Sequence, residues 1–217
     1  VRVPESAVLG KVGDGFRLAQ KRLVPARLTH CMRWLGLADR TLELCKAYIT
    51  TRESFGHVLA RHQMIQKLIA VAATAIPAGN LMTWHCAWML ENGQKKEARP
   101  YSSMAKTHVA RTLCKVLDDA IQMHGGLGFS DDVPCASWYR HARAARIADG
   151  PDEVHEVLVA REYLGSGLNL LVESAPRGRA EYLYKYSNIL VQVFARSRRP
   201  RIRPPSRLPP APAPLAA

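Results

Sequence analysis

Residues 100–123 read PYSSMAKTHVARTLCKVLDDAIQM, and this stretch decides the fold. Apolar or small side chains recur at every third or fourth position, which is the spacing of one face of an α-helix. Gly125 and Gly126 follow directly and are typical of a helix end. The stretch therefore predicts a long helix with an apolar side to bury. That side consists of Tyr101, Met104, His108, Thr112, Val116 and Ile121, with Ala105, Val109, Leu113, Leu117 and Ala120 beside them.

A second helical pattern precedes this stretch. It runs from about residue 26 to residue 53, after a shorter helical segment that Pro25 interrupts, and Gly56 ends it. Its apolar positions again recur every three or four residues, which predicts a face that packs against another helix. These positions are Leu28, Met32, Leu35, Ala38, Leu42, Cys45 and Ile49.

Further helical segments lie between and after these two. One spans about residues 60–91, and Pro77 should kink it because proline removes a helical hydrogen bond. A short helical piece covers residues 134–143, and a last helix starts at about Pro151. Four helices joined by short loops predict an all-α fold, an antiparallel up-down-up-down four-helix bundle. We expect each apolar stripe to be buried, including the residue 60–91 stripe of Ile65, Leu68, Ile69, Ala72, Ile76, Leu81, Trp84 and Trp88.

Composition divides the chain into three parts. Residues 1–14 are extended and turn-rich, and residues 15–166 carry the helical patterns. Residues 167–217 differ in character, and we expect disorder from about residue 197, where Pro and Arg dominate. Of the net charge of +13, residues 172–217 contribute +7, from nine basic and two acidic residues. This basic tail has neither interleaved aromatic residues nor a nucleic-acid-binding motif, so no nucleic-acid partner is predicted.

Several function classes receive little support. The five cysteines form no Cys-x-x-Cys motif, which favours packed, reduced thiols in an intracellular protein. No apolar run reaches the ~20 residues that a membrane span needs, so we predict no membrane span. The Asp152-x-x-His155 pair has a metal-ligand spacing but lacks the further carboxylates of a di-iron site, so we predict no metal.

An ordered set of short motifs resembles the C-terminal domain of the acyl-CoA dehydrogenases, over about residues 1–166. Each motif is common by itself, whereas the set at these spacings is specific. The motifs are Leu9-Gly10-x-x-Gly13-x-Gly15, Thr51-Arg52-Glu53-Ser54-Phe55-Gly56, His62-Gln63, Met104-Ala105-Lys106, Gln122-x-x-Gly125-Gly126-x-Gly128, Tyr139-Arg140, Asp149-Gly150 and Val159-Ala160-Arg161-Glu162-Tyr163.

The resemblance implies FAD as cofactor. Arg52 stands where the family contacts the FAD pyrophosphate of a neighbouring subunit, and a guanidinium suits phosphate oxygens. Phe55 and Gln63 resemble further contacts to the same flavin. The alternatives are a solvated arginine, a core phenylalanine and a solvated glutamine.

A second group of cofactor positions surrounds the paired glycines. Gln122, Gly125 and Gly126 resemble the loop that meets the adenosine part of FAD, where glycine lets the backbone approach a ligand. The alternative is an ordinary helix C-cap. The run Asp149-Gly150-Pro151 replaces the family's usual Glu-Gly-Thr and lacks the threonine contacts to the flavin. The resemblance implies that His155 takes over one of these contacts.

The resemblance makes Asp149 the catalytic base. Family enzymes remove the proton next to a thioester carbonyl, and a carboxylate must reach that proton. Asp149 is one methylene shorter than the usual Glu, although a subgroup of relatives and the nitroalkane oxidases also carry Asp. The alternative is a helix cap for the following segment. Arg27 and Gly150 fall at positions that line the acyl-CoA site, and the alternative for Arg27 is a salt bridge between helices.

The expected activity is therefore α,β-dehydrogenation of an acyl-CoA thioester, with hydride transfer to flavin. Expected partners are an acyl-CoA substrate, a second copy of the chain in a homodimer or homotetramer, and electron-transfer flavoprotein. The compartment is cytoplasmic in a bacterium and mitochondrial or peroxisomal in a eukaryote. Alternatives are a flavin-dependent acyl-CoA or nitroalkane-type oxidase and a non-catalytic helical association module.

The family's N-terminal helical domain and central β-domain have no counterpart in this sequence, apart from a last strand expected at residues 1–8. A flavin that lies between domains would lose most of its walls. We therefore expect the isolated chain to fold as a bundle and to have little or no activity.

Overall fold

The computed structural model describes residue 2 and residues 4–165. The predicted tail beyond residue 165 lies outside the described residues. The described part is helical and contains one two-stranded hairpin. Its main elements are α1 (Gly15–Ile49), β1 (Glu53–Ser54), β2 (His57–Val58), α2 (Gln63–Glu91), α3 (Ala98–His124), α4 (Gly126–Phe129), α5 (Cys135–Ala142) and α6 (Asp152–Leu164), with 3₁₀ turns at Glu5–Ala7, Leu59–Arg61 and Arg143–Arg146.

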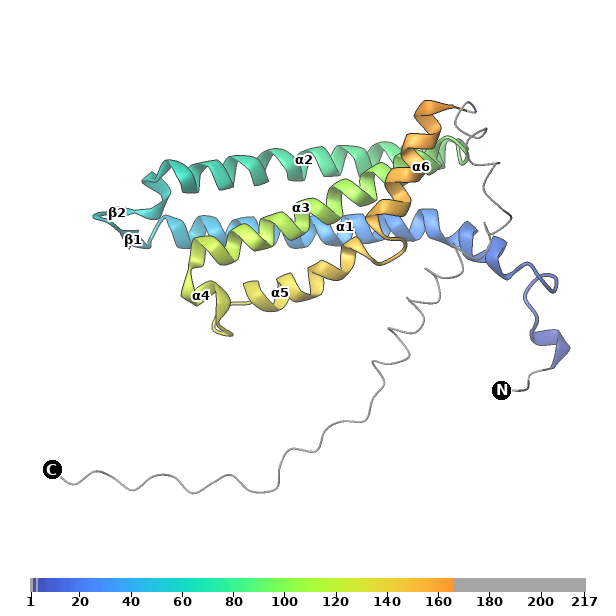
Figure 1. The fold of residues 1–217 in the computed structure, drawn as a ribbon, viewed down its shortest axis with the longest axis horizontal. Coiled ribbons are helices and arrows are strands. Elements are labelled where there is room, and N and C mark those ends of the chain that lie inside the picture. Colours follow the sequence, from blue (N-terminus) through green and yellow to red (C-terminus); the bar gives the residue numbers. More distant parts are fainter. Residues whose placement is uncertain (1, 3, 166–217) are drawn as a thin grey trace, which may run out of the picture. The chain divides into compact units, whose positions relative to one another are not determined.

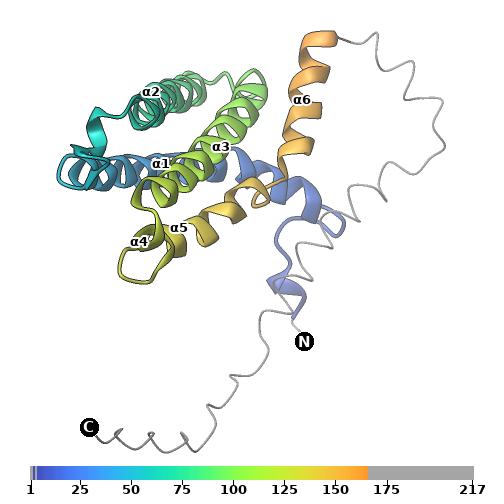
Figure 2. The ribbon, with the colours of Figure 1, turned by 60° about the vertical axis from the view of Figure 1, so that its left-hand side comes forward.

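Three long helices form the body of the domain. Helices α1, α2 and α3 run side by side in alternating directions, and α3 packs against both of the others (Figure 1). Helix α5 packs against α3 and runs in the opposite direction. Helix α6 lies across the N-terminal half of α3 (Figures 1 and 2). The all-α prediction is confirmed, and the last helix packs across the bundle where we had expected it to run alongside.

The core consists of small and branched side chains that meet along α3. Val109 and Leu113 of α3 pack with Leu35 of α1 and Ile76 of α2, and all four are buried. Gly79 of α2 lies so close that an added Cβ would be 2.9 Å from a Leu35 methyl group and 3.1 Å from Val109. The tight contact explains why a glycine stands inside this helix, despite its cost to helix stability.

Two boundaries differ from the prediction. Helix α1 continues through Pro25, whose segment is largely exposed, and burial begins two residues later at Arg27. Proline removes one helical hydrogen bond but its fixed φ is compatible with a helix. The packing of the residues after Pro25 offsets the lost bond, so the helix continues. The strand expected at residues 1–8 is replaced at Glu5–Ala7 by a 3₁₀ turn, and residues 1 and 3 are outside the described residues.

The outer face of α2 contradicts the expected burial of its whole stripe. Leu81, Trp84 and Trp88 are exposed, Trp84 by 64%, because only one face of α2 contacts α1 and α3. The uncovered face is apolar because the helix has no charged residue from 68 to 90. By length and composition alone, Gln63–Glu91 is apolar enough to cross a membrane, which the sequence had not led us to expect. The same finding is common among core helices, and α2 does contribute Ala72 and Ile76 to the core.

Candidate functional site

Asp149 lies on a strained turn directly before α6. Its φ is 53° and that of Gly150 is 114°, so two consecutive residues occupy the left-handed half of the backbone map. Aspartate tolerates this region better than most residues, but it still costs free energy there. The N-cap of α6 is Pro151, and no side chain caps this helix. Asp149 is therefore not a helix cap in this structure, and its carboxylate remains available for other contacts.

Two cations hold the backbone of this turn from inside the bundle. Arg27 of α1 donates from Nε to the carbonyl oxygen of Asp149 at 3.1 Å. Lys106 of α3 donates from Nζ to the carbonyl oxygen of Gly150 at 2.7 Å. Both side chains are buried, so the two bonds are shielded from competing water. The turn is consequently fixed to two helices that are far from it in sequence.

A buried ion cluster lies behind the turn. The Lys106 ammonium is 0% exposed and lies 3.6 Å from Oδ1 of Asp152, the first residue of α6. Arg111 and Arg146 donate from Nε to the other oxygen of Asp152, at 3.1 and 2.7 Å. Burial alone would raise the pKa of Asp152, but these three cations lower it below its ordinary value. Burial lowers the pKa of Lys106, and Asp152 opposes that shift.

His155 packs beneath the same turn. Its Nδ1 lies 2.9 Å from the Ser103 hydroxyl, and a Cβ added to Gly150 would lie 2.9 Å from its Nε2. Nε2 is buried and has no hydrogen-bond partner among the described residues. Burial lowers the pKa of His155 to about 4, helped by Arg27 and Lys106 nearby. The residue predicted to touch flavin thus lies inside the domain as a neutral ring, next to the turn of Asp149.

The Asp149 side chain faces two residues of α1. Its Oδ2 lies 3.0 Å from Nδ1 of His30, and its Oδ1 lies 4.0 Å from a terminal nitrogen of Arg22. The carboxylate is 15% exposed and the imidazole 32%. Arg27 and Asp149, from the predicted substrate and catalytic positions, are therefore brought together, and His30 joins them.

The cofactor positions predicted near residue 52 lie at the opposite end of α1. Phe55 and Gly56 form the turn of the β1–β2 hairpin, with φ values of 53° and 77°. Positive φ at both central residues is the pattern of a type I′ turn, which suits a two-residue hairpin. Phe55 is 94% exposed, and Arg52 and Gln63 are exposed too, with no ion pair recorded for Arg52 within the described residues. The hairpin replaces the helix end that we had expected at Gly56.

Gln122, Gly125 and Gly126 lie at this same end, between α3 and α4 (Figure 1). All three are exposed, and Gly125 has a φ of 62°. A shared hydrophobic cluster joins their helix end to the hairpin region. Tyr48 of α1 also stacks on His124 of α3, with ring centroids 4.2 Å apart. Apart from His155, the predicted cofactor residues are thus assembled at one exposed end.

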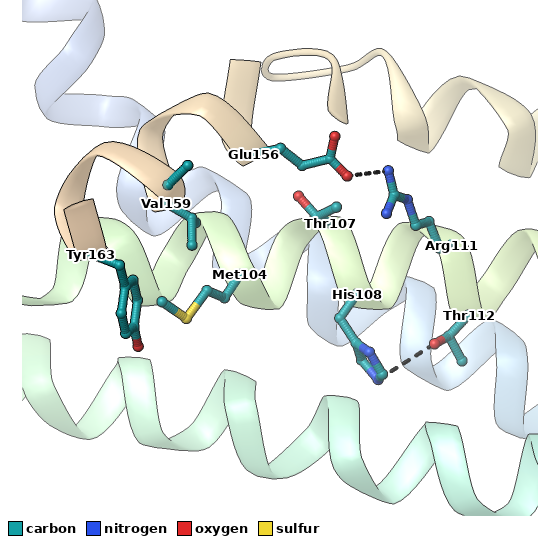
Figure 3. A pocket seen from close by; sticks show the side chains of 9 residues that line it. Met104, Thr107, His108, Arg111, Thr112, Glu156, Val159 and Tyr163 are labelled. Atoms are coloured by element: carbon teal, nitrogen blue, oxygen red, sulfur yellow. Dashed lines mark hydrogen bonds and ion pairs between the residues drawn. The ribbon is translucent and has the colours of Figure 1, made fainter. Parts of the chain in front are cut away.

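A groove of about 580 Å³ lies elsewhere, between α3 and α6 (Figure 3). Arg111 and Glu156 form an ion pair across it, and His108 contacts Thr112 on its other side. None of the predicted site residues lines it, although Arg111 also donates to Asp152 in the ion cluster behind the Asp149 turn. Its lining is Met104, Thr107, His108, Arg111, Thr112, Glu156, Val159, Ala160 and Tyr163.

Sequence reasoning missed three residues of the Asp149 site. The sequence pattern gives Lys106 no role, it assigns Asp152 to the first turn of the last helix or to a metal site that lacks further ligands, and it predicts a core or surface role for His30. A lysine on the apolar side of a predicted helix is the one signal that could have pointed to a buried pair. Among residue 2 and residues 4–165, no cluster of three or more potential ligands could hold a metal ion. Burial raises the pKa of Cys31 and Cys45 to about 12, so these thiols are not nucleophiles.

Fold and site together define an all-α domain with a carboxylate on a fixed turn at one region and an exposed polar edge at another. A model of the acyl-CoA dehydrogenase C-terminal domain matches residues 13–164. The chain belongs to the acyl-CoA dehydrogenase family.

Named relatives agree with this assignment. The probable acyl-CoA dehydrogenase FadE2 of Mycobacterium tuberculosis is 44% identical over 164 residues, which are 76% of this chain and 40% of that protein. Acyl-CoA dehydrogenase family member 11 of rat is 40% identical over 161 residues, 74% of this chain and 21% of that protein. The acyl-CoA dehydrogenase structure from Geobacillus kaustophilus has a TM-score of 0.70 and 28% identity, covering 74% of this chain and 42% of that one. The chain thus spans less than half the length of these relatives.

Proposed function

We propose that this chain is the C-terminal domain of an FAD-dependent acyl-CoA dehydrogenase, in which Asp149 supplies the base for removing the α-proton of an acyl-CoA thioester. The observation that carries the proposal is the turn of Asp149. Its carboxylate does not cap α6, and its backbone is bonded to Arg27 and Lys106. A base must be held at a fixed position relative to the proton it takes, and such a turn meets that need. Strained backbone in a well-supported turn is also typical of functional sites.

Arg27 and Gly150 belong to this proposal as substrate-contacting positions. Arg27 is buried beside Asp149, where a guanidinium that is already bonded to the turn adds positive charge. Positive charge near a thioester carbonyl favours the enolate-like electron density that develops as the α-proton leaves. The positive φ of Gly150 and the 2.9 Å between an added Cβ and Nε2 of His155 favour glycine next to Asp149.

The exposed end has the chemistry that FAD requires. Arg52 offers a guanidinium to phosphate, and the exposed Phe55 ring offers a flat apolar surface. Gln122, Gly125 and Gly126 add polar groups and open backbone. When bound, FAD accepts the hydride that leaves the β-carbon. Because these residues form only an exposed edge, we propose that the other walls come from further domains and from a second copy of the chain in a dimer or tetramer.

The isolated chain is proposed to have little or no activity, because its relatives are more than twice as long. Electrons would pass to electron-transfer flavoprotein, as the family assignment suggests. Absorbance in the flavin region of the purified 217-residue chain tests the first point, and stoichiometric bound FAD would refute it.

The catalytic proposal is tested in a hybrid chain, in which residues 13–164 follow the preceding domains of the FadE2 relative. We expect Asp149→Asn to lower the turnover of an acyl-CoA by at least about 100-fold, because an amide cannot accept the proton. Asp149→Glu is the matched control and should retain measurable turnover. Unchanged turnover in Asp149→Asn would remove Asp149 from the mechanism.

A second candidate is a helical association module without catalysis. The exposed Leu81, Trp84 and Trp88 on α2 favour it, because tryptophans are enriched at protein interfaces. Sedimentation of the chain with Trp84→Glu tests this candidate, and an unchanged sedimentation coefficient would exclude this face as the contact.

A further inference from the structure

The loop that carries Asp149 is closed by a bond between its own two ends. Arg146 is the last residue of the 3₁₀ turn before the loop, and Asp152 is the first residue of α6 after it. Nε of Arg146 donates to Oδ2 of Asp152 at 2.7 Å. Asp149 lies midway between the two residues in the sequence. The side-chain bond therefore ties together the two elements that flank the loop, with Asp149 at its middle.

The same carboxylate also fixes this loop to α3. Nε of Arg111 donates to Oδ2 of Asp152 at 3.1 Å, and Nζ of Lys106 lies 3.6 Å from Oδ1. Lys106 in addition donates to the carbonyl oxygen of Gly150 at 2.7 Å, directly beside Asp149. Asp152 and Lys106 are buried, so water competes little for their contact. One carboxylate thus joins both ends of the loop to the long central helix.

The Asp149 side chain has no comparable support of its own. Its Oδ2 has no hydrogen-bond partner among the described residues, and its Oδ1 lies 4.0 Å from the largely exposed Arg22. A single methylene group attaches the carboxylate to Cα, so its oxygens follow any movement of the backbone. Asp149 and Gly150 both have positive φ, and such strained backbone persists only where the surrounding structure over-determines it. Release of the loop ends should therefore let the turn relax and move the carboxylate.

We propose that Arg146 and Asp152 are positioning residues for the proposed base, because their bond closes the loop and holds the Asp149 carboxylate where it can take the α-proton. The inference rests on the proposed function and goes beyond it, since both residues act through Asp149 and not on the substrate. Proton transfer is sensitive to the position of the base, and a displacement of about 1 Å can lower the rate about 100-fold.

The first test examines the turn in the 217-residue chain itself. The amide proton and Hα of one residue approach each other at positive φ, so the nuclear Overhauser effect between them is strong. We expect a strong effect within Asp149 of the unmodified chain and a weaker one in Arg146→Met, which removes the bond to Asp152. An equally strong effect in Arg146→Met would overturn the proposal.

Arg143→Met is the matched control for this comparison. Arg143 lies on the same 3₁₀ turn as Arg146, is exposed and has no recorded ion pair among the described residues. Its replacement should leave the signal of Asp149 as it is in the unmodified chain. A weaker signal in Arg143→Met, equal to that in Arg146→Met, would likewise overturn the specific role of the bond.

The second test measures turnover in the hybrid chain. We expect Arg146→Met to lower kcat per bound FAD by about 10–100-fold, because the base is misplaced. KM should change by less than about threefold, because Arg27 keeps its place on α1. Arg146→Lys should recover most of the loss, since an ammonium can still pair with Asp152. A residue that only stabilised the fold would lower the amount of folded enzyme and leave kcat per bound FAD unchanged.

Asp152→Asn tests the other end of the bond. It should lower kcat per bound FAD at least as much as Arg146→Met, because Lys106 loses its buried counterion as well. Arg146 is 35% exposed, so its variants are expected to fold and decide the question even where Asp152→Asn does not fold.

The outcomes separate the two proposals. Loss of kcat in Arg146→Met, recovery in Arg146→Lys and full turnover in Arg143→Met support the positioning role. If Asp149→Asn loses turnover while Arg146→Met keeps it within about twofold, Asp149 remains the base and the positioning role is refuted. If Asp149→Asn keeps turnover, the proposed function itself fails, and the positioning role falls with it.

Discussion

The turn that carries Asp149 and the hairpin that carries Phe55 are both built on positive φ angles, yet their surroundings differ. The first is bonded to buried Arg27 and Lys106 and backed by buried Asp152. The second projects from the domain, with Phe55 94% exposed. The strained backbone of the Asp149 turn is supported by the core of the domain, whereas the Phe55 side chain is not covered by any of the described residues.

This difference matches the two tasks in the proposed function. Proton transfer depends on geometry to within about 1 Å, so its group must be held by the domain itself. A cofactor edge contributes only one wall of a larger site, and its side chains can remain exposed until that site is assembled. Substitutions should therefore affect stability strongly near Asp149 and weakly near Phe55.

The largest effect is expected for Lys106→Met. The change leaves the Gly150 carbonyl without its donor and removes one of the three cations around buried Asp152. Removing one partner of a buried pair typically costs about 3–5 kcal/mol. Urea unfolding of the chain measures it, with Lys46→Met as control. Lys46 and Glu43 form an exposed pair, so that change should cost less than about 1 kcal/mol. An equal loss of unfolding free energy in Lys106→Met and Lys46→Met would contradict the view that the Asp149 end is buried and the hairpin end exposed.

The next effect is a pH dependence from His155. Burial lowers the pKa of His155 from 6.5 to about 4. Between these values the unfolded chain binds a proton that the folded chain does not, so the free energy of unfolding falls as the pH drops through this window. The loss should total about 3 kcal/mol at pH 4. Denaturation at a series of pH values measures it.

His155→Gln should flatten that profile, while His57→Gln, at an exposed hairpin position, should leave it as it is. The same slope in His155→Gln and in the unmodified chain would mean that another group causes the pH dependence.

A matched pair of glycines gives the third comparison. Gly150→Ala places a methyl group 2.9 Å from the buried ring of His155 at a φ of 114°, and should cost about 2–3 kcal/mol. Gly56→Ala also meets a positive φ, of 77°, but nothing lies within 4 Å of its Cβ, so about 1 kcal/mol is expected. Thermal unfolding of both variants checks the order, and a reversed order would be incompatible with a packed Asp149 turn.

The smallest effect on stability is expected for Phe55→Ala. The ring is exposed, so its removal should change the free energy of unfolding by less than about 0.5 kcal/mol. In the hybrid chain the same change should weaken FAD binding, which flavin fluorescence measures. A large loss of stability would instead show that Phe55 packs within the domain.

The helices were predictable because their periodicity is long and regular. The stretch at residues 100–123 lies within α3, which spans Ala98–His124. The hairpin was missed because a phenylalanine is an unusual residue at positive φ, so Phe55-Gly56 gave no turn signal. The exposure of Trp84 was missed because an apolar face predicts burial without naming what covers it.

The site was predictable only in part. The motif led to Asp149 and Arg27, which the structure brings together. It could not reveal that Lys106 pairs with Asp152, because charged residues in helices are usually solvated and nothing local links two helices. Likewise, the contact of His30 with Asp149 depends on how α1 passes the turn, which a linear pattern does not encode.

The most direct measurement is exchange of the α-proton of an acyl-CoA with solvent deuterium in the hybrid chain, because exchange reports the base without depending on onward electron transfer. We expect deuterium to enter the α-carbon with the unmodified domain and not with Asp149→Asn. Phe55→Ala should still exchange when FAD is saturating. Exchange in Asp149→Asn at the rate of the unmodified domain would contradict the assignment of the base to the Asp149 turn.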